Sequence, residues 1–187
     1  MATSEQRKLI RSKIEAGASP QQVYDELHGP GNAADEQLAD LVRYVPTLER
    51  RAEYRTAQLV LLFLLALAIA WKAGIVASAV LGEGWSSVVF NSALGIGYAI
   101  ALLAVAKYWR QAHSLAGLLA FMDILHDNDQ PGSSDGMVLP VILLFGVLAV
   151  LSLYLQRMLA PDYIKVKEPY VNADGQKRLK QVVRFGD

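Results

Sequence analysis

Two charged residues, Lys72 and Asp123, stand alone inside the apolar part of this 187-residue chain. In a membrane, a single such charge near the bilayer centre costs about 2.5–3.5 kcal/mol, so an ammonium and a carboxylate at equal depth gain from pairing. A pair of this kind between helices could respond to an ion or a proton. The alternative is that each side chain extends separately to the headgroups, with Trp71 marking the interface. The sequence leaves both arrangements open.

No other residue pattern indicates catalysis or a bound cofactor. The chain has no cysteine, which excludes a thiol nucleophile, a disulfide framework and a cysteine-ligated metal. It contains no zinc-protease motif, nucleophile elbow or glycine-rich phosphate loop. Asp123, His126, Asp127 and Asp129 lie close in sequence but match no metal-specific spacing, so we interpret them as the polar end of a membrane helix. We therefore expect no enzyme, no metal and no cofactor.

The distribution of basic residues indicates an integral membrane protein. Of 18 Lys and Arg residues, eight lie in 1–55 and seven from Arg157 onward, whereas 73–106 and 111–156 contain none. Apolar runs at 57–81, 88–106 and 137–156 are each long enough for a helix that crosses a bilayer core of about 30 Å. No basic stripe with interleaved aromatic residues is present, so we expect no binding of nucleic acid.

The third apolar run, 114–125, is short and contains Asp123. Its length suits a re-entrant or interfacial helix as well as a span. Extended to 110–127 it could cross, and the segments on the inner side would then hold 17 of the 18 basic residues. Because basic residues favour the cytoplasmic side, we prefer four spans with both termini in the cytoplasm. Lys72 and Asp123 would then lie at matching depths, about 20 Å along their helices.

A small-residue face is predicted on the second span. Ala93, Gly97 and Ala101 recur every four residues. Small residues at this spacing let a second helix approach closely, so we expect these three positions to form a helix-packing seam.

The first 55 residues read as short helices. We expect Ser4 to cap the first and Gly17 to end it, and Ser19 with Gln22 to form a capping box at the start of the second. A third helix should follow Asn32, and Thr47 should cap the helix that becomes the first span. About a dozen apolar core residues cannot make a very stable independent domain. We therefore expect this region to pack loosely on itself, on the C-terminal tail or on a partner.

The C-terminal tail is predicted to form strands rather than helices. Residues 163–171 and 177–185 are rich in β-forming residues, and they flank a turn-forming Asn-Ala-Asp-Gly sequence. Pro169 restricts the first strand to a sheet edge. A lone hairpin is marginal in water and needs a surface to lie on. The segment 157–187 carries a net charge of +3, from seven basic and four acidic residues.

These patterns predict an all-α integral membrane protein: a bundle of four transmembrane helices, the third short, with a helical N-terminal cytoplasmic region and a β-hairpin-prone tail. The expected parts are 1–55, 56–157 and 158–187. We expect a non-enzymatic scaffold, adaptor or assembly factor in a bacterial inner (plasma) membrane, in contact with the lipid bilayer and with a protein partner or further copies of itself. The alternative is a subunit of a small oligomeric transporter or channel.

Overall fold

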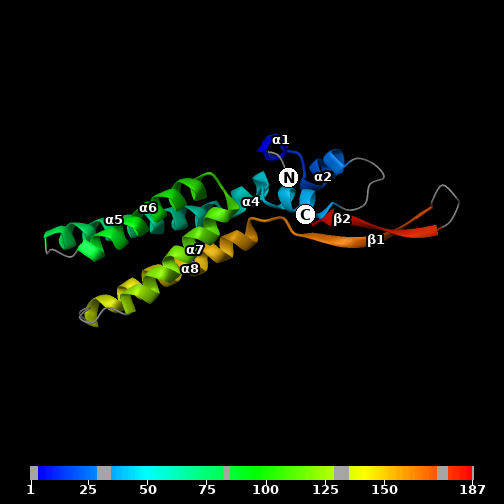
Figure 1. Ribbon diagram of the computed structural model, residues 1–187. Coiled ribbons are helices and arrows are strands. Elements are labelled where there is room, and N and C mark those ends of the chain that lie inside the picture. Colours follow the sequence, from blue (N-terminus) through cyan, green and yellow to red (C-terminus); the bar gives the residue numbers. More distant parts are fainter. Residues whose placement is uncertain (1–3, 29–34, 82–84, 129–134, 172–176, 187) are drawn as a thin grey trace. The chain divides into compact units, whose positions relative to one another are not determined.

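The computed structural model describes residues 4–28, 35–81, 85–128, 135–171 and 177–186. The described chain is mostly helical and ends in a two-stranded β-hairpin (Figure 1). It divides into two compact units. Met1–Glu53 and Leu159–Asp187 together form one, here called the terminal unit, and Tyr54–Met158 forms the other, here called the bundle unit. The N-terminal and C-terminal ends of the chain therefore belong to a single unit.

The bundle unit consists of four helices, at the positions that the apolar runs predict. They are α5 (Arg55–Leu81), α6 (Trp85–Ala106), α7 (Arg110–Asn128) and α8 (Asp135–Met158). Successive helices pack side by side and α5 also contacts α8, which closes the bundle. Three of these helices contain segments long and apolar enough to cross a membrane: Arg55–Leu81, Ser87–Ala106 and Leu139–Met158. The predicted helices are confirmed, and three of them have the length and apolarity that a span requires.

One stripe of each bundle helix faces the interior. On α5 the buried residues follow steps of three and four, the spacing of a single helical face. They are Gln58, Leu61, Leu65, Ala68 and Lys72. This stripe begins and ends with a polar side chain, so the interior of the bundle is polar near two levels and apolar between them.

Shortly after the end of helix α6 stands a residue with an unusual backbone conformation. Tyr108 has φ +55°, in the left-handed region that residues with a Cβ rarely adopt. The Tyr108 N–H donates to the Val105 carbonyl (2.9 Å) and the Trp109 N–H donates to the Ala104 carbonyl (3.0 Å). This is the Schellman pattern, in which glycine is the usual residue at the left-handed position.

We expect Tyr108→Val to lower the stability of the detergent-solubilised protein more than Tyr108→Gly. Both variants lose the aromatic ring, but only valine keeps a Cβ, which costs about 1–2 kcal/mol in the left-handed conformation. Thermal unfolding of the two variants measures the difference. Equal melting temperatures would mean that the chain does not hold this conformation.

The first two helices of the terminal unit begin and end as the sequence predicts. Gly17 follows α1 (Ser4–Glu15) with φ +94°, and the Ala18 N–H bonds back to the Lys13 carbonyl at 3.1 Å. At the start of α2 (Pro20–His28), the Ser19 hydroxyl accepts from the Gln22 N–H (3.2 Å). The Gln22 side chain in turn accepts from the Ser19 N–H (2.9 Å). These two bonds complete a capping box.

Of the next two helix starts, the second differs from the prediction. Asn32 lies outside the described residues, and the cap of α3 (Glu36–Arg43) is Asp35, whose carboxylate accepts from the Leu38 N–H. Thr47 caps a separate short helix, α4 (Leu48–Glu53), rather than the first span. A single turn residue, Tyr54, separates α4 from α5, and α4 belongs to the terminal unit.

The tail forms the predicted hairpin from β1 (Tyr163–Val171) and β2 (Lys177–Phe185), paired antiparallel with Tyr163 opposite Phe185. The predicted turn at 172–175 lies outside the described residues. Because a two-stranded sheet is marginal alone, its stability depends on what one face covers.

The hairpin and the N-terminal helices share one hydrophobic core. Val183 of β2 is fully buried there among residues of α1, α2 and α3. The other buried members are Ile10, Ile14, Val23, Tyr24, Leu38, Ala39 and Val42. Burial raises the pKa of Tyr24, whose hydroxyl accepts from the Asp35 N–H (3.0 Å). The Arg50 guanidinium also donates to the Ala160 carbonyl at 2.8 Å, which ties α4 to the residues after α8.

Candidate functional site in the helix bundle

Lys72 lies inside the bundle, with 1% of its side chain exposed. Its ammonium forms an ion pair with the Asp123 carboxylate of α7 and donates to Asn91 Oδ1 of α6 at 3.1 Å. It also lies 5.4 Å from the centre of the Phe145 ring of α8, within the range of a cation–π contact. The ammonium therefore contacts side chains of three different helices inside the bundle.

Asp123 is fully buried and has a second donor besides Lys72. The Tyr98 hydroxyl of α6 donates to Asp123 Oδ2 at 2.5 Å. The Asn91 amide that faces Lys72 is itself oriented, because its nitrogen donates to the Ser87 carbonyl at 2.9 Å. The polar cluster of Lys72, Asn91, Tyr98 and Asp123 joins α5, α6 and α7, and the ring of Phe145 adds α8.

The charges of this polar cluster sum to zero, since one ammonium faces one carboxylate. Removing one partner of a buried pair leaves an uncompensated charge, whereas the intact pair holds its helices in one arrangement. The arrangement can therefore fix the packing of four helices. The contacts of Asp123 with Lys72 and Tyr98 also allow a proton to move between these groups.

A second buried polar contact was not predicted. His113 of α7 is fully buried, and its Nε2 lies 3.1 Å from Gln58 Oε1 of α5. The Gln58 amide nitrogen donates to the Val105 carbonyl of α6 at 2.6 Å, which fixes the orientation of the amide. The sequence carried a partial signal: Gln58 lies 14 residues before Lys72, close to four helical turns and therefore on the same helix face.

The predicted small-residue seam is present in part. Ala101 is fully buried, and a Cβ on Gly97 would lie 3.2 Å from both methyl carbons of Leu119 on α7. Ala93 is exposed and does not belong to the packed face. Because an α-helix has 3.6 residues per turn, positions spaced by exactly four residues drift around the helix axis. The buried face of α6 at this level is formed by Leu94 and Tyr98 instead.

We expect Gly97→Leu to destabilise the solubilised protein by about 1–3 kcal/mol, the usual cost of overpacking a closed interface. Ile96→Leu is the matched control, because Ile96 is exposed and changes only its branching. Thermal unfolding in one detergent compares the two. Equal effects would mean that this part of α6 does not pack against α7.

The acidic residues at the end of α7 do not form a described metal site. Asp129 and the side chain of Asp127 lie outside the described residues. In the part of the chain that the structure describes, no group of three or more His, Asp or Glu side chains could hold a metal ion. Asp123 instead pairs with Lys72, and the His126 ring packs on Phe90, with ring centres 4.0 Å apart.

Comparisons with protein-family models, with curated proteins and with solved structures found no match to this chain.

Proposed function

We propose that this chain is a non-enzymatic membrane protein that serves as a scaffold, adaptor or assembly factor. Its bundle unit is the anchor, and its terminal unit presents a binding surface in the cytoplasm. The observation that carries the proposal is the shared core of the terminal unit, in which Val183 packs against α1, α2 and α3. Two segments more than a hundred residues apart meet there in a small folded unit, a form suited to holding a partner.

The shared core also supports four spans. Segments that pack into one core lie on the same side of a membrane, so the chain between them must cross an even number of times. Three helices have the length and apolarity of spans, which is an odd number. We infer that α7 is the fourth.

The surface of α7 agrees with that inference. Its polar side chains His113 and Asp123 are buried within the bundle. Apart from Gln111 in the first turn, the exposed side chains among its described residues are apolar, as lipid contact requires. They are Leu115, Leu118, Phe121, Met122 and Leu125.

With four spans, the distribution of basic residues favours a cytoplasmic location for both termini and for the terminal unit. The lack of cysteine agrees with our proposal of a bacterial inner membrane. A protein partner of the terminal unit, or further copies of the chain, would complete the assembly.

The buried polar cluster favours a second candidate, a subunit of a small oligomeric transporter or channel. Ionisable side chains within spans often mark ion and proton paths. Here, however, the cluster is neutral and the ammonium of Lys72 already has three partners. Four helices are also few for a path within one chain, so transport would need an oligomer.

The test uses the full-length protein and two variants of the tail. Val183→Asp should unfold the terminal unit, and Ile164→Asp, at an exposed position, should not. The proposal predicts a protein that co-purifies with the wild type and Ile164→Asp but not with Val183→Asp, and that binds the purified chain at a fixed stoichiometry. Identical co-purifying proteins for all three chains, together with a proton flux in proteoliposomes that Lys72→Met abolishes, would overturn it in favour of transport.

A further inference from the structure

One end of the bundle unit gathers the start of α5 and the ends of α6 and α8. The Gln58 amide near the start of α5 donates to the Val105 carbonyl near the end of α6 at 2.6 Å. The rings of Tyr54 and Tyr154 meet edge to face with centres 6.1 Å apart, so α8 ends at the same place. Exposed basic side chains from these three helices share this end, here called the basic end. They are Arg55, Lys107 and Arg157.

The bundle unit has little acidic charge to balance its basic end. In the described part of the chain, neither Arg55 nor Arg157 forms an ion pair. The buried Asp123 is paired with Lys72. The other acidic residues of the unit, at positions 83, 127, 129 and 135, lie in or beside the connections that follow α5 and α7. The basic end therefore suits an anion from outside the chain.

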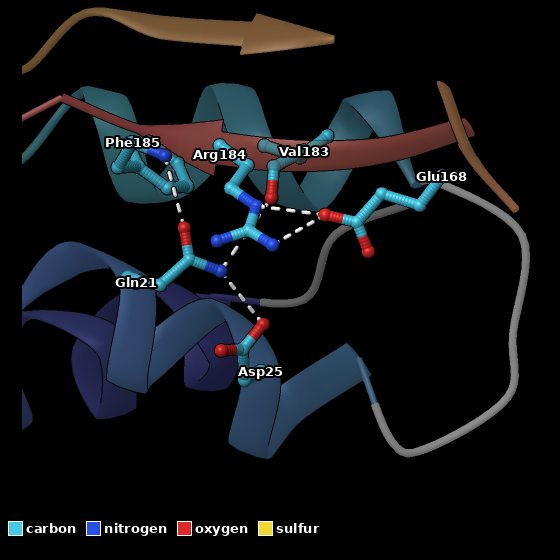
Figure 2. A network of polar contacts seen from close by, with 6 residues as sticks. All are labelled: Gln21, Asp25, Glu168, Val183, Arg184 and Phe185. Atoms are coloured by element: carbon cyan, nitrogen blue, oxygen red, sulfur yellow. Dashed lines mark hydrogen bonds and ion pairs between the residues drawn. The ribbon is translucent and has the colours of Figure 1, made fainter. Parts of the chain in front are cut away.

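Basic side chains of the terminal unit are balanced within the chain more often. Arg184 of β2 binds the Glu168 carboxylate of β1 through two nitrogens (Figure 2). The Lys165 ammonium lies 2.5 Å from a carboxylate oxygen of Glu36, and the bond between them raises the pKa of Lys165. The contrast distinguishes the basic end from an ordinary charged surface of this chain.

An exposed leucine lies one helical turn from each cation of the basic end, on the side toward the middle of the bundle. Residues four apart in a helix lie on the same face. A cation followed by an apolar side chain is thus repeated on three helices. A phospholipid has the matching chemistry, because its phosphate is followed by acyl chains. The leucines are Leu59 after Arg55, Leu103 before Lys107 and Leu153 before Arg157, each more than half exposed.

An indole ring stands beside the same end. Trp109 follows Lys107 by two residues and is 55% exposed. The left-handed conformation of Tyr108 and the bond from the Trp109 N–H to the Ala104 carbonyl (3.0 Å) hold the backbone of this turn. Indole rings at the ends of membrane helices lie at the level of the lipid headgroups. With the bundle unit as the anchor, the basic end lies at the level of the phosphates.

We propose that the basic end of the bundle unit binds the phosphate of anionic phospholipids, in preference to zwitterionic phospholipids. The inference uses the proposed membrane anchor and goes beyond the proposed scaffold role. Each basic residue near an anionic membrane surface strengthens binding about fivefold. An acidic protein segment is a poorer occupant, because it offers no acyl chain to the exposed leucines.

The test uses Trp109 as a reporter beside the site. The chain has three tryptophans, so Trp71→Phe with Trp85→Phe leaves only Trp109. The full-length protein with these two changes is placed in phosphatidylcholine vesicles that contain a small fraction of brominated phosphatidylglycerol or, separately, of brominated phosphatidylcholine. Bromine quenches a nearby indole. We expect phosphatidylglycerol to associate at least tenfold more strongly, by an amount that falls as salt screens the charges.

Two matched variants locate the effect. The variant that removes the three cations of the basic end, R55Q/K107Q/R157Q, should quench equally with the two lipids. The control removes three exposed cations from the terminal unit and should keep the preference for phosphatidylglycerol; it is R7Q/K8Q/K167Q.

Thermal unfolding verifies that each variant is folded. If the phenylalanine background is not, wild-type tryptophan replaces it, because the comparison of the two triple variants cancels the other two indoles. If the basic-end variant is not, Arg157→Gln replaces it with an expected loss of about fivefold.

Equal quenching of the unchanged basic end by the two lipids would overturn the inference. So would an equal loss in the two triple variants, because the preference would then follow net charge alone. Inorganic phosphate that abolishes the preference, where chloride at the same ionic strength does not, would also overturn it and would indicate a site for a soluble anion. Each of these outcomes would leave the scaffold role of the terminal unit standing.

Discussion

Replacing Asp123 by leucine is expected to lower the unfolding free energy of the detergent-solubilised protein by about 3 kcal/mol or more, the usual cost of removing one partner of a buried pair. The change leaves the Lys72 ammonium, 1% exposed, without its carboxylate. It also removes the acceptor of the Tyr98 hydroxyl. Lys72→Met should have a similar effect, because it leaves a buried carboxylate with Tyr98 as its donor.

A double-mutant cycle isolates the interaction. The double variant, Lys72→Met with Asp123→Leu, should cost less than the sum of the two single changes, because no isolated charge remains in the interior. Thermal or denaturant unfolding of the four proteins gives the coupling energy. Additivity within about 0.5 kcal/mol would show that the two side chains do not interact, and the polar cluster would lose its central contact.

The second large effect is expected in the terminal unit. Val183→Asp places a carboxylate in a fully buried position, where an isolated charge has neither water nor a partner. Because Val183 packs with α1, α2 and α3, this change in the tail should expose the N-terminal helices, far away in sequence. Hydrogen exchange should show faster exchange in Ser4–Glu15 and Pro20–His28, while α5 to α8 keep their protection.

Ile164→Asp is the control, since Ile164 is 64% exposed on the neighbouring strand and carries the same new charge. It should leave the exchange of the N-terminal helices unchanged. Faster exchange confined to the tail in Val183→Asp would contradict the shared core.

Much of the bundle could be predicted from the sequence, because length, apolarity and charge act along single helices. The runs at 57–81, 88–106, 110–127 and 137–156 each match a helix to within a few residues. The capping box of Ser19 and Gln22 and the helix end at Gly17 are also local features, and both are confirmed.

What the sequence could not predict depends on contacts between distant residues. The core that joins Val183 to α1, α2 and α3 has no local signature, because a β-rich tail only shows that it needs some surface. The contact of His113 with Gln58 joins α7 to α5, so neither helix alone has a pattern that predicts it. Ala93 was assigned by spacing alone, and the rotation of a four-residue step takes it out of the packed face.

We propose that both ends of the chain form one cytoplasmic unit and that the bundle unit crosses the membrane four times. Single cysteines at Ser133 and Ala173, in a chain without native cysteine, test it by labelling with a membrane-impermeant reagent in intact and in opened cells. The account predicts that Ser133 reacts from outside and Ala173 only from the cytoplasmic side. Reaction of both positions from the same side would contradict it, because α7 would then not cross.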